Sequence, residues 1–352
     1  MRLSRETVKV LQNGSCSVEI DPFGGAITKF CVHGKKINPL NFRLPAEQMP
    51  ENNKAGAPYQ GHFLCLGRWG RPSDGEIKAG MPDHGQLCNI HWETEDTGLM
   101  RLEMRAFSPM EGLHVNRRID LSRDSPLYMV TEEVYNTSAL GRLYNMVQHP
   151  TLGQPFLDHD TVVNCNAEAG FDHSFGVDRE MYASNWPMGL CRDMTTIDLS
   201  APKKEYSSVF SYVVKKTDKM GWVTAYSPTH NLLLGYLWKR SDYPWIILWQ
   251  DWLGSSIRYR GIEFGTTGIH KSFKQMLSDG DWKVFGENTC EYIDAGEKSS
   301  RKYLSFLCDV NPGFKGVDEI YYSNGDVVIK DNVSGQNIEL SMNPVVDKHN
   351  PF

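Results

Sequence analysis

The sequence lacks the features that direct a chain to a membrane, a nucleic acid or a bound metal. No run reaches the roughly 18 apolar residues that a membrane span needs. The net charge of −6 offers no attraction to nucleic acid or anionic lipid. The eight cysteines form no CxxC pair, which disfavours a zinc ribbon or a thioredoxin-like site. We interpret the cysteines as reduced, small core residues.

Targeting and cofactor-binding signatures are also missing. The N-terminal stretch MRLSRETVKVLQNGS contains no apolar run of signal-peptide length. We therefore expect a cytoplasmic protein, or a periplasmic or secreted one if a leader was removed. The sequence contains no phosphate-binding GxxxxGK motif, no GxGxxG, no HExxH and no GxSxG. We expect no cofactor, no metal, and neither a membrane nor a nucleic-acid partner; the oligomeric state stays open.

Strand signals, in contrast, run along the whole chain. Apolar and polar residues alternate at period two over 98–107, 113–122 and 127–138, and residues 15–38 resemble two strands around a Gly-Gly turn. The same alternation recurs later in the chain, at 208–216, 222–228, 231–240, 245–252, 301–310 and 326–331. This pattern predicts an all-β protein, a large antiparallel β-sandwich.

We expect a single domain over residues 1–352, because strands continue in the same style on both sides of the most linker-like stretch. That stretch, residues 45–61, is polar and rich in proline and glycine, and we interpret it as a rim loop or lid. Residues 340–352 are expected to form a peripheral tail. Helix is expected only in short pieces, near 46–49 or 178–186.

Two stretches rich in glycine or proline carry ionisable side chains. Residues 65–87 hold Arg68, Arg71 and His84 among five glycines. Glycine lets the backbone approach a ligand, and arginine binds oxygen-rich groups with two parallel N–H donors. The ordinary interpretation is a surface loop. His149 precedes a proline in NMVQHPTLG, so its backbone should be extended. Its structural alternative is a buried neutral imidazole bonded to backbone.

Two strand-like stretches carry further candidates. Glu263 lies between apolar residues in YRGIEFGTTG. If its side chain faces inward, desolvation raises its pKa and makes it a better base near neutral pH. If it faces outward, it is only the polar residue of an alternating strand. YPWIILWQDW contains Trp249, Gln250 and Asp251. Aromatic faces stack on sugars, and amides and carboxylates bind hydroxyls, although a core strand is the alternative.

Taken in order, these stretches resemble the galactose mutarotase-like, or aldose 1-epimerase-like, superfamily. VEIDPFGGAITKFCVHGKKI is similar to the family's opening hairpin, and GRWGRP with MPDHG resembles its arginine-bearing stretch and its His-Gly. EEVYNTSALGRLYNMVQHPTLGQPFLD resembles its central histidine strand, and RGIEFGTTG its glutamate strand. The resemblance spans residues 15–310 and is nearest to a less-characterised branch with an unassigned sugar.

The resemblance implies a role for each candidate. Glu263 falls at the family's general base, His149 at its general acid, and His84 at the histidine that helps to hold the sugar. Arg71, or else Arg68, matches the substrate-binding arginine. The hydroxyl-binding positions of the family correspond to the stretch around Trp249, Gln250 and Asp251, where this sequence departs most from the usual pattern.

The implied chemistry needs an acid and a base together. An aldose ring opens when the anomeric hydroxyl loses a proton as the ring oxygen gains one, and each catalytic group typically contributes roughly 10²–10⁴-fold. We expect an ionised Glu263 and a protonated His149. The resulting hypothesis is an isomerase of the aldose 1-epimerase (mutarotase) type acting on a monosaccharide or sugar derivative. The alternatives are a non-catalytic carbohydrate-binding protein on the same scaffold and, less favoured, a polysaccharide lyase or hydrolase.

Overall fold

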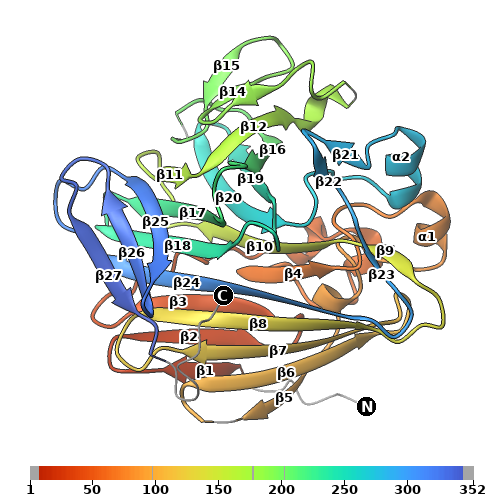
Figure 1. Ribbon diagram of the computed structural model, residues 1–352, viewed down its shortest axis with the longest axis horizontal. Helices are drawn as coiled ribbons and strands as arrows, with labels where there is room; N and C mark the ends of the chain where they lie inside the picture. The colour runs from red at the N-terminus through yellow and green to blue at the C-terminus, as the bar shows by residue number, and fades with distance from the viewer. Residues whose placement is uncertain (1–7, 97, 177, 202, 344–352) are drawn as a thin grey trace.

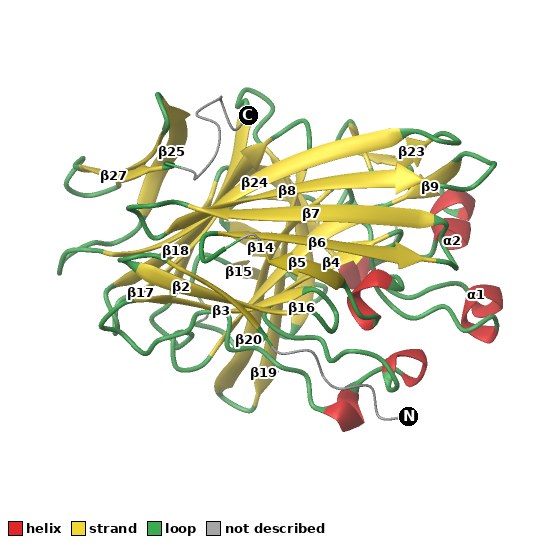
Figure 2. Ribbon diagram, turned by 90° about the horizontal axis from the view of Figure 1, so that it is seen from below, coloured by secondary structure: helices red, strands yellow, loops and turns green. Residues whose placement is uncertain are grey.

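Two large antiparallel sheets that pack face to face make up most of the protein (Figures 1 and 2). The structure is a computed structural model that describes residues 8–96, 98–176, 178–201 and 203–343. Nearly all of its regular structure is strand, and the alternating segments expected from the sequence all contain one. The expected all-β antiparallel sandwich is therefore confirmed.

The first large sheet contains the strands that bear the candidate catalytic residues. Its ten strands, in spatial order, are β1 (Lys9–Gln12), β2 (Cys16–Asp21), β3 (Ala26–Val32), β4 (His62–Leu66), β10 (Met146–Gly153), β20 (Ser256–Gly265), β19 (Trp245–Leu253), β16 (Ser208–Val214), β12 (Ala167–Asp172) and β13 (Ser184–Asn185). The expected Gly-Gly turn joins β2 and β3, with Gly24 and Gly25 at positive φ.

The second large sheet forms the other layer of the sandwich. Its eight strands are β11 (Val162–Cys165), β17 (Met220–Ser227), β18 (Leu232–Lys239), β24 (Lys298–Asp309), β8 (Leu127–Asn136), β7 (Leu113–Leu121), β6 (Arg101–Ser108) and β5 (Glu93–Asp96). A small third sheet packs on its outer face through a separate apolar cluster that includes Phe306 and Ile329. That sheet contains β25 (Val317–Ser323), β26 (Asp326–Asp331) and β27 (Asn337–Ser341).

The peripheral tail predicted from residue 340 overlaps the last strand of the small sheet. Leu340 and Ser341 belong to β27, where backbone pairing with β26 and burial of Leu340 fix them to the small sheet. Residues 344–352 of the predicted tail lie outside the described residues.

The remaining elements are short. They are the paired strands β14 (Met188–Leu190) with β15 (Thr196–Asp198), β21 (Lys283–Val284) with β22 (Glu287–Asn288) and β9 (Arg142–Tyr144) with β23 (Glu291–Ile293), the 3₁₀ turns η1 (Ala46–Gln48), η2 (Glu51–Asn53), η3 (Leu87–Asn89) and η4 (His173–Phe175), and the helices α1 (Asp74–Lys78) and α2 (Phe273–Ser278). Helical structure was expected at 46–49, where η1 lies, but 178–186 contains none. The two helices instead follow Ser73 and Ser272, whose hydroxyls cap the first turn.

The structure shows the state of the cysteines and the length of the helices. All eight cysteines are unpaired, and all except the half-buried Cys290 are buried, as expected. Among the described residues, no helix is both long enough and apolar enough to cross a bilayer.

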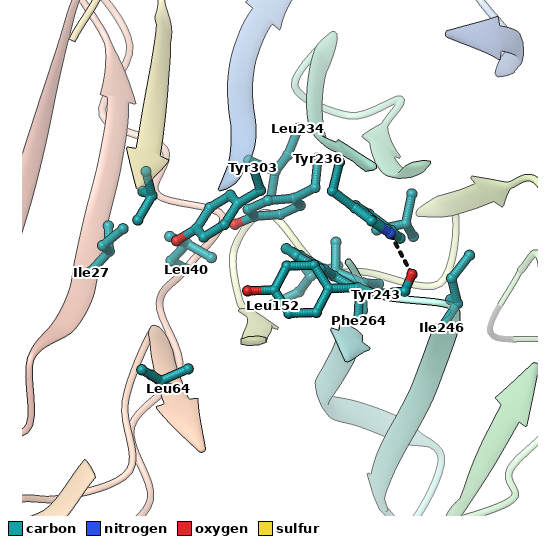
Figure 3. Close-up of a cluster of buried hydrophobic side chains, with 14 of the residues drawn as sticks. Ile27, Leu40, Leu64, Leu152, Leu234, Tyr236, Tyr243, Ile246, Phe264 and Tyr303 are labelled. Atoms are coloured by element: carbon teal, nitrogen blue, oxygen red, sulfur yellow. Dashed lines mark hydrogen bonds between the residues drawn. The ribbon is translucent and has the colours of Figure 1, made fainter. Parts of the chain in front are cut away.

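The main hydrophobic core lies between the two large sheets. Figure 3 shows side chains of β3, β4, β10, β19 and β20 meeting side chains of β18 and β24. Phe264 is at the centre of this region, stacked on Trp238 at 4.1 Å between ring centroids. The Trp238 indole N–H donates to the Tyr243 carbonyl at 2.7 Å, so this large aromatic residue is buried with its donor satisfied.

A polar network crosses this apolar layer and connects the sheets. Arg117 of β7 donates to Glu132 of β8 at 2.7 Å, and Gln148 of β10 donates to the other oxygen of Glu132 at 2.6 Å. The Gln148 carbonyl oxygen contacts His62 Nε2 of β4 at 3.1 Å. All four side chains are buried. Because unpaired buried charges are costly, this network favours one alignment of β10 against the opposite sheet.

We expect Glu132→Gln to destabilise the fold strongly, because it leaves the Arg117 guanidinium buried without a counter-charge. The free energy of unfolding, measured by urea denaturation, should fall by about 3–5 kcal/mol. The matched control is Glu93→Gln, which breaks the exposed ion pair with Arg105 and should cost less than about 1 kcal/mol. Equal losses in both variants would contradict a structural role for the network.

Candidate active site

His149 and Glu263 lie next to each other on adjacent strands of the ten-stranded sheet. In the β10–β20 register, Gln148 pairs with Phe264 and Thr151 with Gly261, so His149 lies opposite Glu263. His149 Nε2 is 3.2 Å from Glu263 Oε1. The histidine is 7% exposed and the glutamate 1% exposed. Two residues more than a hundred positions apart therefore share one face of the sheet and contact each other, as the acid–base hypothesis requires.

The neighbours of His149 hold its ring and can accept a proton carried on Nδ1. Phe63, the cross-strand partner of His149 on β4, stacks on the imidazole at 4.3 Å between centroids. Nδ1 lies 3.0 Å from the hydroxyl oxygen of Thr151, which is two residues along the same strand. That hydroxyl can donate to the His149 carbonyl at 3.5 Å and accept from an Nδ1–H. In that tautomer, Nε2 presents a lone pair to Glu263.

Burial sets the protonation state of the pair. Desolvation raises the pKa of Glu263 well above its usual value, an effect that the nearby Trp69 indole N–H opposes. Desolvation lowers the pKa of His149 in the opposite direction. Both shifts favour a neutral carboxyl group that donates to a neutral imidazole. The sequence predicted an ionised Glu263 beside a protonated His149; burial instead favours the other distribution of the same single proton.

An aromatic surface extends from the pair along β19 and β20. Trp249 is half-buried, with its ring 6.3 Å from that of His149. The half-buried Tyr259 ring is nearly parallel to Trp249 at 6.4 Å, and Phe42 meets both rings edge-on. Between them Gly261 leaves space: an added Cβ would lie 2.7 Å from Glu263 Oε1. The arrangement offers apolar ring faces beside an acid–base pair.

The loop after β4 covers the other side of the pair. His84, half-buried and at a positive φ of 62°, has its ring 5.6 Å from that of His149. Its Nδ1 accepts from the Gly70 N–H at 3.2 Å, so a neutral ring carries its proton on Nε2. The His270 ring is 5.7 Å from His84 and 4.8 Å from Trp69. Gly70 makes this contact possible, because a Cβ there would lie 2.6 Å from His270.

The guanidinium of Arg68 is already paired with carboxylates. It is 4% exposed and donates two parallel hydrogen bonds to Glu76, at 2.8 and 2.9 Å. Its Nε lies 3.7 Å from the fully buried Glu111. Burial raises the pKa of Glu111, and the hydrogen bond from Ser108 and the charge of Arg68 counteract that shift. Arg68 thus anchors the loop that contains Trp69 rather than offering its guanidinium to a ligand.

Of the other predicted substrate-binding residues, Arg71 lies in the loop after β4, and Gln250 and Asp251 lie on opposite faces of β19. Arg71 is exposed at the rim of a pocket that His270 also lines. Asp251 is on the same face as Trp249 and pairs with Arg258 at 2.6 Å. Gln250 is not brought to the pair: strand alternation turns it to the opposite face, where it donates to the Tyr206 carbonyl at 2.6 Å.

The predicted rim loop, residues 45–61, is packed against this region. Asn53 is fully buried and donates to the Tyr59 hydroxyl at 2.5 Å and to Asn89 at 2.8 Å. Tyr59 in turn stacks on Phe63 at 5.0 Å and meets His84 edge-on at 5.2 Å. The loop therefore holds the rings that surround His149.

Several residues of the site were not singled out from the sequence. Thr151 and Tyr259 were accessible to simple reasoning, because they lie two and four positions from His149 and Glu263 on the same strands and so share their faces. Phe63, Trp69 and His270 carried no comparable signal, because cross-strand register and loop packing bring them to the pair.

The fold can be compared with solved structures. No protein-family model and no curated protein matches the sequence. A galactose mutarotase related enzyme from Lactobacillus acidophilus is 13% identical with a TM-score of 0.61, covering 87% of this chain and all of that one. A galactose mutarotase-like protein from Clostridium acetobutylicum is 16% identical with a TM-score of 0.60, covering 86% and 95%. The fold is galactose mutarotase-like.

A protein from Synechocystis sp. PCC 6803 is structurally similar as well, at 14% identity and a TM-score of 0.62, covering 88% of this chain and 98% of the other. The resemblance inferred from the sequence is thus confirmed at the level of fold. Identities this low say nothing about activity, so function has to be inferred from the site.

We expect the two arginines of GRWGRP to behave differently when replaced. Arg68→Met leaves the buried Glu111 without its nearby cation and removes both bonds to Glu76, so unfolding free energy should fall by about 2–4 kcal/mol. Arg71→Met, at an exposed position, should change it by less than about 0.5 kcal/mol. Urea denaturation of both variants measures the difference, and a stable Arg68→Met protein would rule out the anchoring role.

The raised pKa of Glu263 should also be visible in stability. A folded-state pKa above the unfolded value of 4.5 means that this stabilisation is complete below pH 4.5 and is lost as pH rises toward the folded value. The difference in unfolding free energy between wild type and Glu263→Gln should therefore change by up to about 1.4 kcal/mol per pH unit above pH 4.5, to the disadvantage of wild type. Denaturation at pH 5, 6, 7 and 8 measures it. A difference that is independent of pH would exclude a buried, protonated Glu263; the exposed Glu103→Gln is the control.

Proposed function

We propose that the protein is an aldose 1-epimerase-type isomerase that interconverts the anomers of a sugar by general acid–base ring opening. The observation that supports this most directly is the 3.2 Å contact between His149 Nε2 and Glu263 Oε1 on one face of the sheet. The galactose mutarotase-like fold is consistent with it. Two groups that share one proton provide one donor and one acceptor at the same time.

The close spacing of the pair suits this reaction. The anomeric hydroxyl oxygen and the ring oxygen are both bonded to C1, so they lie side by side rather than at opposite ends of the sugar. An adjacent donor and acceptor can therefore address both oxygens from one edge of the ring. The sugar would lie over the pair, with its C–H face near Trp249 and Tyr259.

The proposed ring opening needs no proton donor or acceptor other than these two residues. In the neutral pair His149 Nε2 accepts the proton of the anomeric hydroxyl while Glu263 donates its proton to the ring oxygen, and the C1–ring oxygen bond breaks. Transfer of the shared proton along the 3.2 Å contact gives the reverse assignment, with Glu263 as the base. After rotation about C1–C2, the ring closes on the other face and the protons return. The two residues therefore titrate and act as a unit.

We expect Glu263→Gln to reduce anomer exchange by roughly 10²–10⁴-fold, because the amide neither accepts nor releases the proton. Exchange between anomers of a panel of aldoses is measured by NMR, over the rate in buffer alone. Glu103→Gln, on an exposed position of the other sheet, is the control and should retain the wild-type rate.

Two outcomes would contradict the proposal. Full exchange activity in a correctly folded Glu263→Gln protein would exclude the pair from the chemistry. Saturable sugar binding by wild type with no exchange across the panel would instead support the alternative, a carbohydrate-binding protein on the same scaffold.

A further inference from the structure

One buried donor beside the acid–base pair lacks a hydrogen-bond partner among the described residues. Trp69 lies in the loop between β4 and α1 (Figure 1) and is 2% exposed, and its buried indole nitrogen makes no hydrogen bond. Three other buried tryptophans, Trp92, Trp238 and Trp245, donate to backbone carbonyls at 3.0, 2.7 and 2.8 Å. An unsatisfied buried N–H is costly, so the indole of Trp69 calls for an explanation.

The Trp69 N–H is beside an acceptor that is equally unused. Glu263 Oε2 is buried and makes no hydrogen bond to the described residues, while Oε1 lies 3.2 Å from His149 Nε2. Trp69 is close enough to Glu263 for its N–H to counteract the effect of burial on the pKa of that carboxyl group. Hydrogen bonds to ionised acceptors are shorter and about twice as strong as neutral ones. The two unused atoms therefore suit an ionised Glu263 better than a neutral one.

The surroundings of Trp69 hold the indole in place. The rings of His270 and His173 meet it edge-on, at 4.8 and 5.8 Å between centroids. His173 is itself held, since its Nε2 lies 2.8 Å from the hydroxyl oxygen of Ser211. The adjacent Arg68 anchors the loop through two hydrogen bonds to α1. Because the ring is packed and its loop is anchored, the N–H has little freedom to reach another acceptor.

The other ionisable groups around Trp69 and Glu263 are neutral near pH 7. They are Cys65, His84, His149, His173 and His270. Burial raises the pKa of the Cys65 thiol and lowers the pKa of each imidazole. Ring opening nevertheless puts a negative charge on Glu263, because its carboxyl group gives a proton to the sugar ring oxygen. That charge forms away from water, where a donor already in place is most effective.

We propose that Trp69 is a positioning residue for the reaction, whose indole N–H donates to Glu263 Oε2 as that carboxyl group loses its proton. The inference rests on the proposed function and adds a residue to it. His149 gains a proton in the same step and faces Oε1, so the two oxygens of the carboxylate are held by different residues. Trp69 thereby lowers the energy of the ring-opened state without touching the sugar.

Titration followed by NMR tests the contact without any substrate. In protein labelled with ¹⁵N-tryptophan and ¹³C-glutamate, the Trp69 N–H resonance should move over the same pH range in which the Glu263 carboxyl carbon titrates. In Glu263→Gln the N–H resonance should not change over that range. Its absence from the spectrum of Trp69→Phe assigns it. An N–H resonance that stays constant while Glu263 ionises would overturn the proposal.

The pH profile of anomer exchange tests the role in the reaction. Trp69→Phe keeps an aromatic ring without the N–H, so kcat should fall by about 10–100-fold, the loss of one hydrogen bond to a charged group, while KM changes little. Without the donor, the pair should lose its shared proton at higher pH, because the carboxylate is less stable. The alkaline limb of the profile should therefore move up by about one pH unit.

The matched control is Trp245→Phe, which removes an indole N–H bonded to the Asn288 carbonyl at 2.8 Å and should leave the limb in place. A lower kcat in Trp69→Phe with an unmoved limb would indicate a packing role and overturn the proposal. Should Trp69→Phe fail to fold, replacement of Trp69 by benzothienylalanine, which has the shape of tryptophan with sulfur in place of the N–H, provides the same measurement.

The two proposals fail in different ways. Exchange that requires Glu263 but keeps the wild-type kcat and alkaline limb in Trp69→Phe would overturn the role of Trp69 and leave the epimerase intact. Undiminished exchange in Glu263→Gln, with the Trp69 N–H of wild type still titrating with Glu263, would overturn the epimerase mechanism and leave only the hydrogen bond standing.

Discussion

The alternation of side chains at residues 148 and 149 is the constraint on which the site depends. Gln148 faces the interior and bonds to Glu132 and His62, while His149 faces the opposite side and contacts Glu263. Because strand side chains alternate with period two, a slip of one residue would exchange these positions. It would break the buried polar network and remove the imidazole from the carboxyl group at once, so the energetics of the core fix the geometry of the site.

The ionisable side chains on the two faces of β10 also differ in how their charge is neutralised. On the inner face, the Arg117 charge is balanced by Glu132, and each group is held by further hydrogen bonds. On the outer face, the shared proton lets His149 and Glu263 stay neutral. Among the described residues, Glu263 Oε2 and the nearby Trp69 indole nitrogen both lack a partner with hydrogen-bond geometry. A buried carboxyl oxygen that accepts no hydrogen bond lowers the stability of the fold. Its presence beside a half-exposed aromatic surface is consistent with a role that a bound hydroxyl completes.

Most strands could be predicted from the sequence, but the positions of several polar side chains and of the two short helices could not. Period-two alternation located the strands, since it reports which side chains a sheet buries. It did not say on which face each half-buried polar residue falls: Gln250 was grouped with Trp249, although neighbours along a strand necessarily point apart. The sequence predicted Arg71, or else Arg68, as the substrate-binding arginine. The Arg68 guanidinium instead pairs with Glu76 and Glu111, which lie 8 and 43 residues after it in the chain. The helices α1 and α2 were missed because they are single capped turns without an amphipathic period.

By itself the sequence determined the class of fold, because alternation and glycine turns are local signals, and its resemblance to a known superfamily singled out His149 and Glu263 as the two residues to test. Tertiary structure decided everything that depends on distance across the chain. Pairing of β10 with β20 brought His149 to Glu263, and the loops after β4 and β20 brought Trp69, His84 and His270 around them. It also decided the proton's position, since desolvation is a property of the surroundings and not of the residue.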